Sequence, residues 1–537
     1  MKKKNLILTK IFYIMFEFVT DGGFTFSNMI ISKIQETAKA FPQKNAIIYN
    51  DYQISYSQLE EITSKLANGL RNTNIQAGDR IALLMPNLPH FIFCYYAILK
   101  IGGIVVPINY MMEDDEFDGV LRNIRPQAII YWDGFRKYIQ NYLENMAEKP
   151  IVIVLGKTKS IDQDNLTDLI ARSNSELDIH QISPDDTAVI QFTSGVTDAP
   201  KGIELSYGNL LTSIEGTAKF FRFNESDVFG AVLPLFFIFT QNVLLSSALF
   251  KGGTIVLHPK IDFPKIAQSI DQHKISVLAG SPHFYESLVN LEPASFSGVS
   301  LKYCISSWQK LPEELETKFE SRFGVPLLNC YSITELCGLV AANHPSFERK
   351  IGSVGLRLPH IEIQVHDEQG NPLDHNVVGE IVVQGKAVMK NYWNLPELTE
   401  DRMKNGWFYT ADLGKIDAQG NIFLINKKSE VIVKSGFPIY TSEIEQLLAG
   451  HPKVKEAVVL SIPHPDHKED VQAYIALKDN ETATPEEIIE YCRGQIPVYK
   501  CPKVVKFYPS LPRTKMGRIF KRKLQENSTS LKVEHGA

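Results

Sequence analysis

Ten residues of the chain, 193–202, combine the groups that bind phosphate. They have the sequence Thr-Ser-Gly-Val-Thr-Asp-Ala-Pro-Lys-Gly and follow a predicted strand at 187–192. Hydroxyl groups, backbone N–H groups and one lysine ammonium supply what polyphosphate oxygens need, because those oxygens only accept hydrogen bonds. A Walker A loop is excluded, because Pro200 precedes Lys201 and Gly202 follows it. A hairpin turn has a similar composition, so this segment alone leaves both interpretations open.

Segments far downstream favour the phosphate-binding interpretation. Residues 193–202 resemble the phosphate loop of the adenylate-forming acyl-CoA synthetase superfamily, and the other motifs of that family follow in the same order. These segments are Tyr331–Glu335, Gly352–Gly355 with Gly379-Glu380 and Tyr392-Trp393, Gly406–Leu413, Val431–Glu445 and Pro512–Ile519. The resemblance extends from about Ile30 to Leu524. Several motifs in one order identify the family far more firmly than any single motif does.

The resemblance implies a reaction in two steps. A carboxylate attacks the α-phosphate of ATP to give an acyl-adenylate and pyrophosphate, and the thiol of coenzyme A then attacks the adenylate. The implied cofactors and co-substrates are ATP, Mg²⁺ and coenzyme A, and the implied partner is a small-molecule carboxylic acid. An acyl-carrier-protein thiol is an alternative acceptor.

The resemblance also assigns roles to the residues that match the motifs. The predicted catalytic residues are Arg518, Lys201 and Glu335. The predicted ATP-binding residues are Thr193, Ser194, Gly195, Thr197, Lys201, Trp308, Tyr331, Ser332, Thr334, Asp412 and Lys427. Glu335 and Thr197 are the predicted Mg²⁺ ligands, since this hard cation prefers oxygen. Lys428 is the predicted hinge, and Ser435 and Gly436 are the predicted binding site of coenzyme A.

The sequence departs from the family pattern at residues close to the chemistry. Arg518 stands where the family has a lysine, and Lys427 stands where it has an arginine, and neither exchange is conservative. Residues 307–309, Ser-Trp-Gln, replace a Gly-Gly-Ala of the family, so Trp308 adds a large side chain there. Ser332 and Ala411 also replace glycines, which matters wherever φ is positive. Two hypotheses follow: an active ligase with a reshaped site, or a catalytically impaired homologue that binds nucleotide or an acyl group. The retained motif residues favour the active ligase.

The predicted acyl pocket is apolar. Residues 234–239 resemble the family segment beside the acyl group, with Phe237 in place of a histidine, and Phe237 and Trp308 are the predicted pocket residues. No aspartate is present in this segment to pair with the ammonium of an amino acid, whose burial without a partner would be costly. The sequence therefore predicts a fatty or other hydrophobic acid. Simple core packing is the alternative explanation of these rings.

Predicted strands and helices alternate from residue 30 onward, which favours an α/β fold with layered, largely parallel sheets. The predicted helices and strands in the first half include helices at 55–70 and 90–101 and strands at 80–85 and 104–108. Residues 242–257 repeat the order of apolar helix, Gly-Gly and strand. We predict an N-terminal extension at 1–28, an AMP-binding domain at 29–426 with a β-rich subdomain at 352–426, and a hinged, mobile α+β domain at 427–537.

Composition excludes several classes of protein. The 537 residues include 56 Lys+Arg and 61 Asp+Glu, and the net charge of -5 gives no basic footprint for nucleic acid. Six cysteines without a C-x-x-C pair favour a reducing compartment, and we predict a cytoplasmic protein, with peripheral contact to a membrane left open. Residues 6–19 are mostly apolar but contain Lys10 and Glu17, so they predict no stable membrane span. A surface helix, or translation from Met15 or Met29, would also account for them.

Overall fold

The computed structural model describes most of the chain after residue 28. The described residues are 29–112, 114–144, 146, 148–157, 164–177, 181–193, 200–292, 296–434, 437–464, 468–513 and 519–530. They divide into two compact units, one within 1–193, 200–363 and 383–408 and the other within 364–382 and 409–537. The predicted boundary at residues 426/427 stays a prediction.

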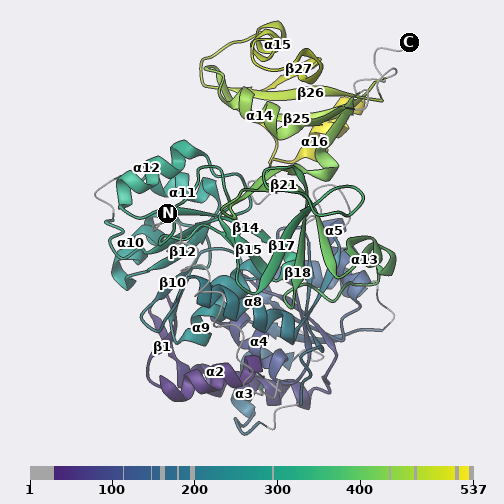
Figure 1. Cartoon of the computed structure of the whole chain (residues 1–537). Coiled ribbons are helices and arrows are strands. Elements are labelled where there is room, and N and C mark those ends of the chain that lie inside the picture. The colour runs from purple at the N-terminus through teal and green to yellow at the C-terminus, as the bar shows by residue number, and fades with distance from the viewer. Residues whose placement is uncertain are drawn as a thin grey trace. The chain divides into compact units, whose positions relative to one another are not determined.

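The first unit contains a nine-stranded sheet with the order β16-β15-β14-β13-β12-β10-β11-β1-β2. Figure 1 labels β15, β14, β12, β10 and β1 of this sheet. Its strands are β1 (Asn45–Tyr49), β2 (Tyr52–Ser55), β10 (Val228–Ala231), β11 (Thr254–Leu257), β12 (Val277–Gly280), β13 (Tyr303–Ser306), β14 (Leu327–Ile333), β15 (Gly338–Ala342) and β16 (Leu356–Arg357). The run from β14 through β13, β12 and β10 is parallel. The carboxyl ends of these four strands therefore lie at one edge of the sheet.

A second sheet of the first unit has eight strands in the order β19-β9-β8-β4-β3-β5-β6-β7. Its strands are β3 (Arg80–Leu84), β4 (Ile104–Pro107), β5 (Ala128–Trp132), β6 (Ile151–Leu155), β7 (Asp164–Asn165), β8 (Thr187–Phe192), β9 (Gly202–Ser206) and β19 (Asn391–Tyr392). β8 and β9 form an antiparallel hairpin in which Phe192 stands opposite Gly202. The predicted phosphate-binding segment connects these two strands.

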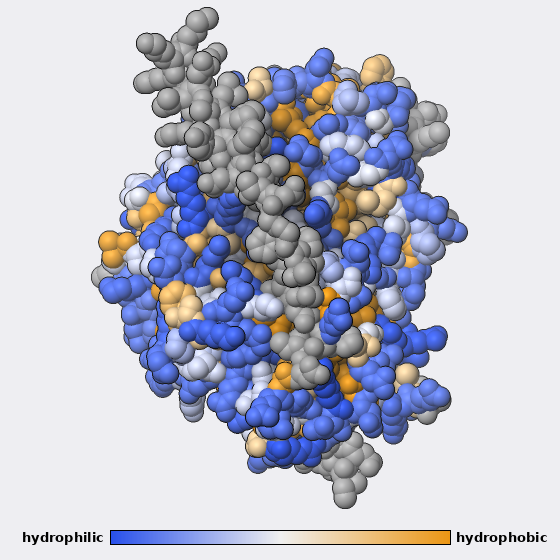
Figure 2. All heavy atoms as spheres, turned by 60° about the horizontal axis from the view of Figure 1, so that its bottom comes forward, coloured by the Kyte–Doolittle hydropathy of each residue, from blue (hydrophilic) through white to orange (hydrophobic). Residues whose placement is uncertain are grey.

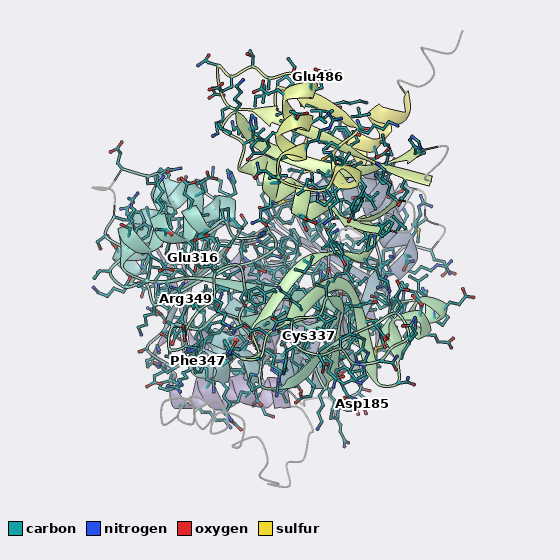
Figure 3. The ribbon with its side chains drawn as sticks, turned by 45° about the horizontal axis from the view of Figure 1, so that its top comes forward. Asp185, Glu316, Cys337, Phe347, Arg349 and Glu486 are labelled. Carbon is teal, nitrogen blue, oxygen red and sulfur yellow. The ribbon has the colours of Figure 1, made fainter. Side chains whose placement is uncertain are left out.

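Helices cover the sheets of the first unit. They are α2 (Met29–Ala40), α3 (Tyr56–Asn72), α4 (Pro89–Lys100), α5 (Asp114–Ile124), α6 (Arg136–Glu144), α7 (Leu166–Arg172), α8 (Tyr207–Phe220), α9 (Ser247–Lys251), α10 (Phe263–His273), α11 (Pro282–Val289), α12 (Glu313–Phe323) and α13 (Pro396–Arg402). α3 packs against α4 and α7. A guanidinium N–H of Arg349 donates to Glu316 of α12 at 2.8 Å (Figure 3).

The expected helices and strands are confirmed, with one difference. The Ser55 side chain and Gln58 form a capping box at the start of α3, which explains why this helix begins where the sequence predicts. In the segment 242–257, however, the helix begins as a π-helix, η2 (Thr240–Ser246), and becomes α-helical only in α9. The strand β11 then follows two glycines, as expected.

The rest of the chain is rich in short sheets. A five-stranded sheet has the order β17-β18-β21-β20, with β22 paired to β21. Its strands are β17 (Ile361–His366), β18 (Gly379–Gly385), β20 (Met403–Lys404), β21 (Trp407–Ile416) and β22 (Ile422–Lys427). The last part of the chain contains β23 (Val431–Lys434), β24 (Phe437–Tyr440), α14 (Thr441–Ala449), β25 (Val454–His464), β26 (Lys468–Leu477), α15 (Pro485–Arg493), β27 (Val504–Tyr508) and α16 (Lys521–Ser530). The predicted α/β class with a small α+β C-terminal part is confirmed.

Burial agrees with the composition. All six cysteines are buried and none forms a disulfide, as their spacing predicts. The face in Figure 2 is mostly hydrophilic, with hydrophobic side chains in small groups among polar ones. Within the part of the chain that the structure describes, no helix is long and apolar enough to cross a membrane.

Candidate active site

The base of the predicted phosphate loop is closed by two residues. The backbone N–H of Thr193 donates to the carbonyl oxygen of Lys201 at 3.0 Å, and the Lys201 N–H lies 3.4 Å from the Thr193 hydroxyl. These contacts continue the β8–β9 hairpin by one step, so both residues stand at the mouth of the connecting loop. The predicted phosphate contacts Ser194, Gly195 and Thr197 lie outside the described residues.

Three predicted ATP-binding residues and the predicted metal ligand Glu335 lie close together at the carboxyl end of β14. Tyr331 is buried, whereas Ser332, Thr334 and Glu335 are half-buried. The chain turns here through the 3₁₀ helix η4 (Thr334–Leu336), which ends at Cys337 with φ 57°. In open α/β sheets, ligands bind outside the carboxyl ends of parallel strands. These residues therefore stand where the fold class places a ligand.

The turn after β14 is held by hydrogen bonds from two side chains of neighbouring helices. The carbonyl oxygen of Cys337 accepts hydrogen bonds from the Ser213 hydroxyl at 3.1 Å and from the Asn242 side-chain amide at 2.7 Å. Cys337 is fully buried. α8 and the π-helix η2 thus supply polar side chains to the turn that contains Glu335.

The side chain of Glu335 accepts a hydrogen bond from a tyrosine. The Tyr392 hydroxyl donates to its Oε1 at 2.8 Å, and the backbone N–H of Met389 donates to its carbonyl oxygen at 2.7 Å. Burial, together with the negative charge of Glu335, raises the pKa of Tyr392 well above its ordinary value. Tyr392 therefore stays a neutral donor to this carboxylate.

The predicted acyl-pocket residues come together at the same sheet edge. Phe237 follows β10 and Trp308 follows β13, and their ring centroids are 5.9 Å apart. Both side chains are half-buried, whereas Phe239, whose ring lies 5.2 Å from Trp308, is buried. Trp308 has φ 71°, the left-handed region that a glycine would adopt without strain.

Asn87 fixes the backbone of the segment that leads to Phe237, and no sequence motif indicated this residue. Its side-chain N–H donates to the Leu233 carbonyl at 2.8 Å, and its oxygen accepts from the Leu235 N–H at 2.9 Å. Asn87 is almost fully buried. The loop after β3 thereby holds the segment that leads to Phe237.

In the second unit, Asp412 and Lys427 stand directly opposite each other on the antiparallel strands β21 and β22. Side chains of such a pair point to the same face of the sheet. Lys428 follows at once and begins the 3₁₀ helix η5 (Lys428–Glu430). Its ammonium contacts Glu380 at 2.8 Å. The two strands thus bring Asp412 close to Lys427 and Lys428, which lie 15 or more positions further along the chain.

Comparison with known proteins decides the family. The family model described as AMP-binding enzyme matches residues 34–393, and the model of the AMP-binding enzyme C-terminal domain matches residues 443–518. The chain belongs to the AMP-binding enzyme family.

Individual relatives of this AMP-binding enzyme agree with the assignment. A long-chain-fatty-acid–CoA ligase of Bacillus subtilis is 30% identical, over 93% of this chain and 94% of that protein. The crystal structure of ATP-bound MatB from Rhodopseudomonas palustris has a TM-score of 0.83 at 28% identity, and covers 92% of this chain and 98% of that one. A fatty acyl CoA synthetase of Mycobacterium tuberculosis has a TM-score of 0.77 at 26% identity, with 94% and 98% covered. The predicted enzyme class, an AMP-forming acid–CoA ligase, is confirmed.

Three further predicted residues of this AMP-binding enzyme, Arg518, Ser435 and Gly436, lie outside the described residues. The neighbours of the last two are described: Lys434 and Phe437 form a pair at the end of the β23–β24 hairpin, and the Lys434 ammonium contacts the buried Asp470 at 2.6 Å. Arg513 and Ile519, on either side of the segment that contains Arg518, form an isolated antiparallel β-bridge with each other.

Glu335 is the carboxylate that the motifs assign to a metal ion. Among the residues that the structure describes, no group of three or more His, Cys, Asp or Glu could hold a metal ion. Mg²⁺ commonly binds through one or two carboxylates together with phosphate oxygens and water. The half-buried carboxylate of Glu335 fits that kind of binding.

Proposed function

We propose that the protein joins a fatty or other hydrophobic carboxylic acid to coenzyme A, with ATP and Mg²⁺, through an acyl-adenylate. The approach of the Phe237 and Trp308 rings at the carboxyl ends of β10 and β13 carries this proposal. Half-buried aromatic rings favour an apolar ligand, because covering them removes hydrocarbon surface from water. The name of the Bacillus subtilis relative supports the same class of acid.

The first step needs positive charge near the polyphosphate. We assign this role to the Lys201 ammonium and to the hydroxyl and backbone donors of the 193–202 segment, with Arg518 acting near the reacting carboxylate. Fixed donors stabilise developing charge better than water does, because they need not reorient. Tyr331 is assigned to the adenine and Asp412 to the ribose hydroxyls. Mg²⁺, held with Glu335, would offset the negative charge of the phosphates.

The second step transfers the acyl group to a thiol. We assign the entry of the pantetheine arm to Ser435 and Gly436, which connect β23 to β24. Release of AMP accompanies formation of the thioester, so the acid, ATP and coenzyme A give acyl-CoA, AMP and pyrophosphate.

Mass spectrometry of the full-length protein tests the proposal. The protein is incubated with ATP, Mg²⁺, coenzyme A and a pooled panel of fatty and aryl acids, and acyl-AMP and acyl-CoA are measured. Acyl-CoA of an apolar acid is the expected product. Formation of acyl-AMP with transfer only to a phosphopantetheinylated carrier protein would overturn the choice of thiol, and an absence of both products would overturn the activity.

Two variants separate the role of the phosphate loop from that of Arg518. Lys201→Ala should lower the rate of acyl-AMP formation by at least about tenfold, since it removes a charge contact to the phosphates. Arg518→Lys restores the residue of the family pattern. Product from this variant but not from the parent would show that natural adenylation has been lost. Equal ATP turnover by Lys201→Ala and the parent would contradict the assignment of Lys201.

A further inference from the structure

Glu380 links two predicted functional segments of the second unit, although no role follows for it from the motifs. It lies on β18, and only 8% of its side chain is exposed. Its Oε1 accepts a hydrogen bond of 2.9 Å from the backbone N–H of Ala411, and its Oε2 accepts one of 2.8 Å from the Lys428 ammonium. A single buried carboxylate therefore contacts the residue before Asp412 and the predicted hinge.

The backbone of β21 is left-handed at Ala411, and we call residues 410–412 the Ala411 turn. This conformation needs support from its surroundings. Ala411 has φ 60°, a conformation in which a Cβ atom is strained and which glycine adopts freely. Strained residues of this kind persist only where neighbouring groups hold them. The Glu380 carboxylate supplies one such contact, directly on the Ala411 N–H.

Thr410 supplies two further hydrogen bonds to the same turn. Its hydroxyl donates to the Ile381 carbonyl at 2.8 Å and accepts from the Asp412 N–H at 3.1 Å. β18 therefore holds the turn through the Glu380 side chain and through the backbone of the next residue. The direction of the Asp412 carboxylate depends on this turn, because Asp412 directly follows Ala411 in the chain.

The second contact of Glu380 lies on the partner strand. Lys428 follows Lys427, which stands opposite Asp412 in the β21–β22 register. The Lys428 side chain is half exposed, whereas that of Glu380 is buried, so Lys428 supplies the positive charge that the buried carboxylate requires. The ion pair thus ties the end of β22 to the turn in β21.

We propose that Glu380 is a positioning residue for the nucleotide: its carboxylate holds the left-handed Ala411 turn, and thereby Asp412, and pairs with Lys428. The inference rests on the proposed function, because nucleotide binding is its readout. Its action is indirect, through the orientation of Asp412. Removing Glu380 should therefore weaken nucleotide binding, and relieving the strain at Ala411 should restore it.

Titration calorimetry of the full-length protein with AMP and with α,β-methylene-ATP tests the inference. Glu380→Ala should raise the Kd about tenfold, since a buried hydrogen-bonded carboxylate is lost. Glu380→Gln keeps an acceptor for the Ala411 N–H and should raise the Kd by no more than about threefold. The double variant Glu380→Ala with Ala411→Gly should recover most of the affinity, because glycine adopts the turn without help.

Asp417→Ala is the matched control. Asp417 is a buried carboxylate at the other end of the same β21–β22 hairpin, where it accepts hydrogen bonds from the N–H groups of Gln419 and Asn421. The Asp417→Ala variant should have a lower melting temperature than the parent and the same nucleotide Kd. An equal loss of affinity in both alanine variants, or no rescue by Ala411→Gly, would reduce Glu380 to a structural residue. A parent protein that binds neither nucleotide would overturn the proposed function itself, whereas unchanged binding by Glu380→Ala alone would overturn only this inference.

Discussion

The hydroxyl of Tyr392 lies 2.8 Å from Oε1 of Glu335, and the two residues are 57 positions apart in the sequence. Tyr392 belongs to β19, which pairs with β9 directly after the predicted phosphate loop. Glu335 lies in the turn after β14. One hydrogen bond thus connects the eight-stranded sheet to the site edge of the nine-stranded sheet, and it fixes one oxygen of the predicted metal-binding carboxylate.

Tyr392→Phe removes this hydrogen bond and keeps the ring. Loss of a group that orients a metal-binding carboxylate commonly costs about 10- to 100-fold in metal affinity or activity. We expect the Mg²⁺ concentration for half-maximal adenylation to rise, with little change in the melting temperature. Initial rates at fixed ATP and varied Mg²⁺ measure the effect, and Mn²⁺ binding followed by electron paramagnetic resonance gives a readout that is independent of turnover. Identical metal dependence in both proteins would contradict this role of Tyr392.

Asp412→Ala should weaken nucleotide binding about tenfold or more, because hydrogen bonds to a charged group are lost. Lys427→Ala should have a smaller effect than Asp412→Ala. The lysine ammonium would make a single contact to the nucleotide, whereas the two carboxylate oxygens of Asp412 can accept hydrogen bonds from the ribose hydroxyls. Because the two residues are opposite each other across the strands, their effects should not be additive. A double-mutant cycle on the nucleotide Kd measures the coupling. Strict additivity would show that the two side chains act separately.

Trp308→Gly should change which acids are accepted. The variant removes the indole that lies beside Phe237 and Phe239, and glycine adopts φ 71° without strain. We expect the ratio of kcat/KM for longer or bulkier acids to that for smaller acids to rise by about tenfold or more. The reason is that the volume of a pocket limits the size of the acid that it accepts. Trp308→Phe, which keeps a ring, is the control. An unchanged order of preference in the glycine variant would place the indole outside the acyl pocket.

Stability should fall as the pH is lowered, in part because of His344. This residue is buried beside Phe347, with ring centroids 5.1 Å apart. Burial, aided by the positive charge of Arg222, lowers the pKa of His344 from 6.5 to about 4. The unfolded chain therefore binds more protons between these pH values, so the free energy of unfolding decreases as the pH falls through that range.

For His344 the loss amounts to about 3 kcal/mol across the full range. His344→Phe should flatten the pH dependence of the free energy of unfolding between pH 6.5 and 4, as measured by urea denaturation. The variant also removes the acceptor of the Ser346 N–H, so its stability at pH 8 serves as the reference. An unchanged slope below pH 6.5 would contradict the prediction.

The sequence by itself determined the features that depend on neighbouring residues. Ser55 and Gln58 cap α3 through a contact over three positions, and the predicted strand at 187–192 was found as β8. The family was identifiable because its motifs are short and keep their order. The absence of paired cysteines was visible in the same way. All these signals are local, so neither packing nor register had to be known.

The tertiary structure decided which distant residues support the site. Asn87 contacts a carbonyl 146 positions away, and Glu380 reaches Lys428 over 48 positions. Replaced glycines were visible in the sequence, but only the backbone shows that Trp308 and Ala411 adopt a positive φ, whereas Ser332 is not among such residues. Hydrogen bonds between distant segments form only when strand order and register bring their ends together. No local pattern encodes that arrangement, because it results from the packing of the whole sheet.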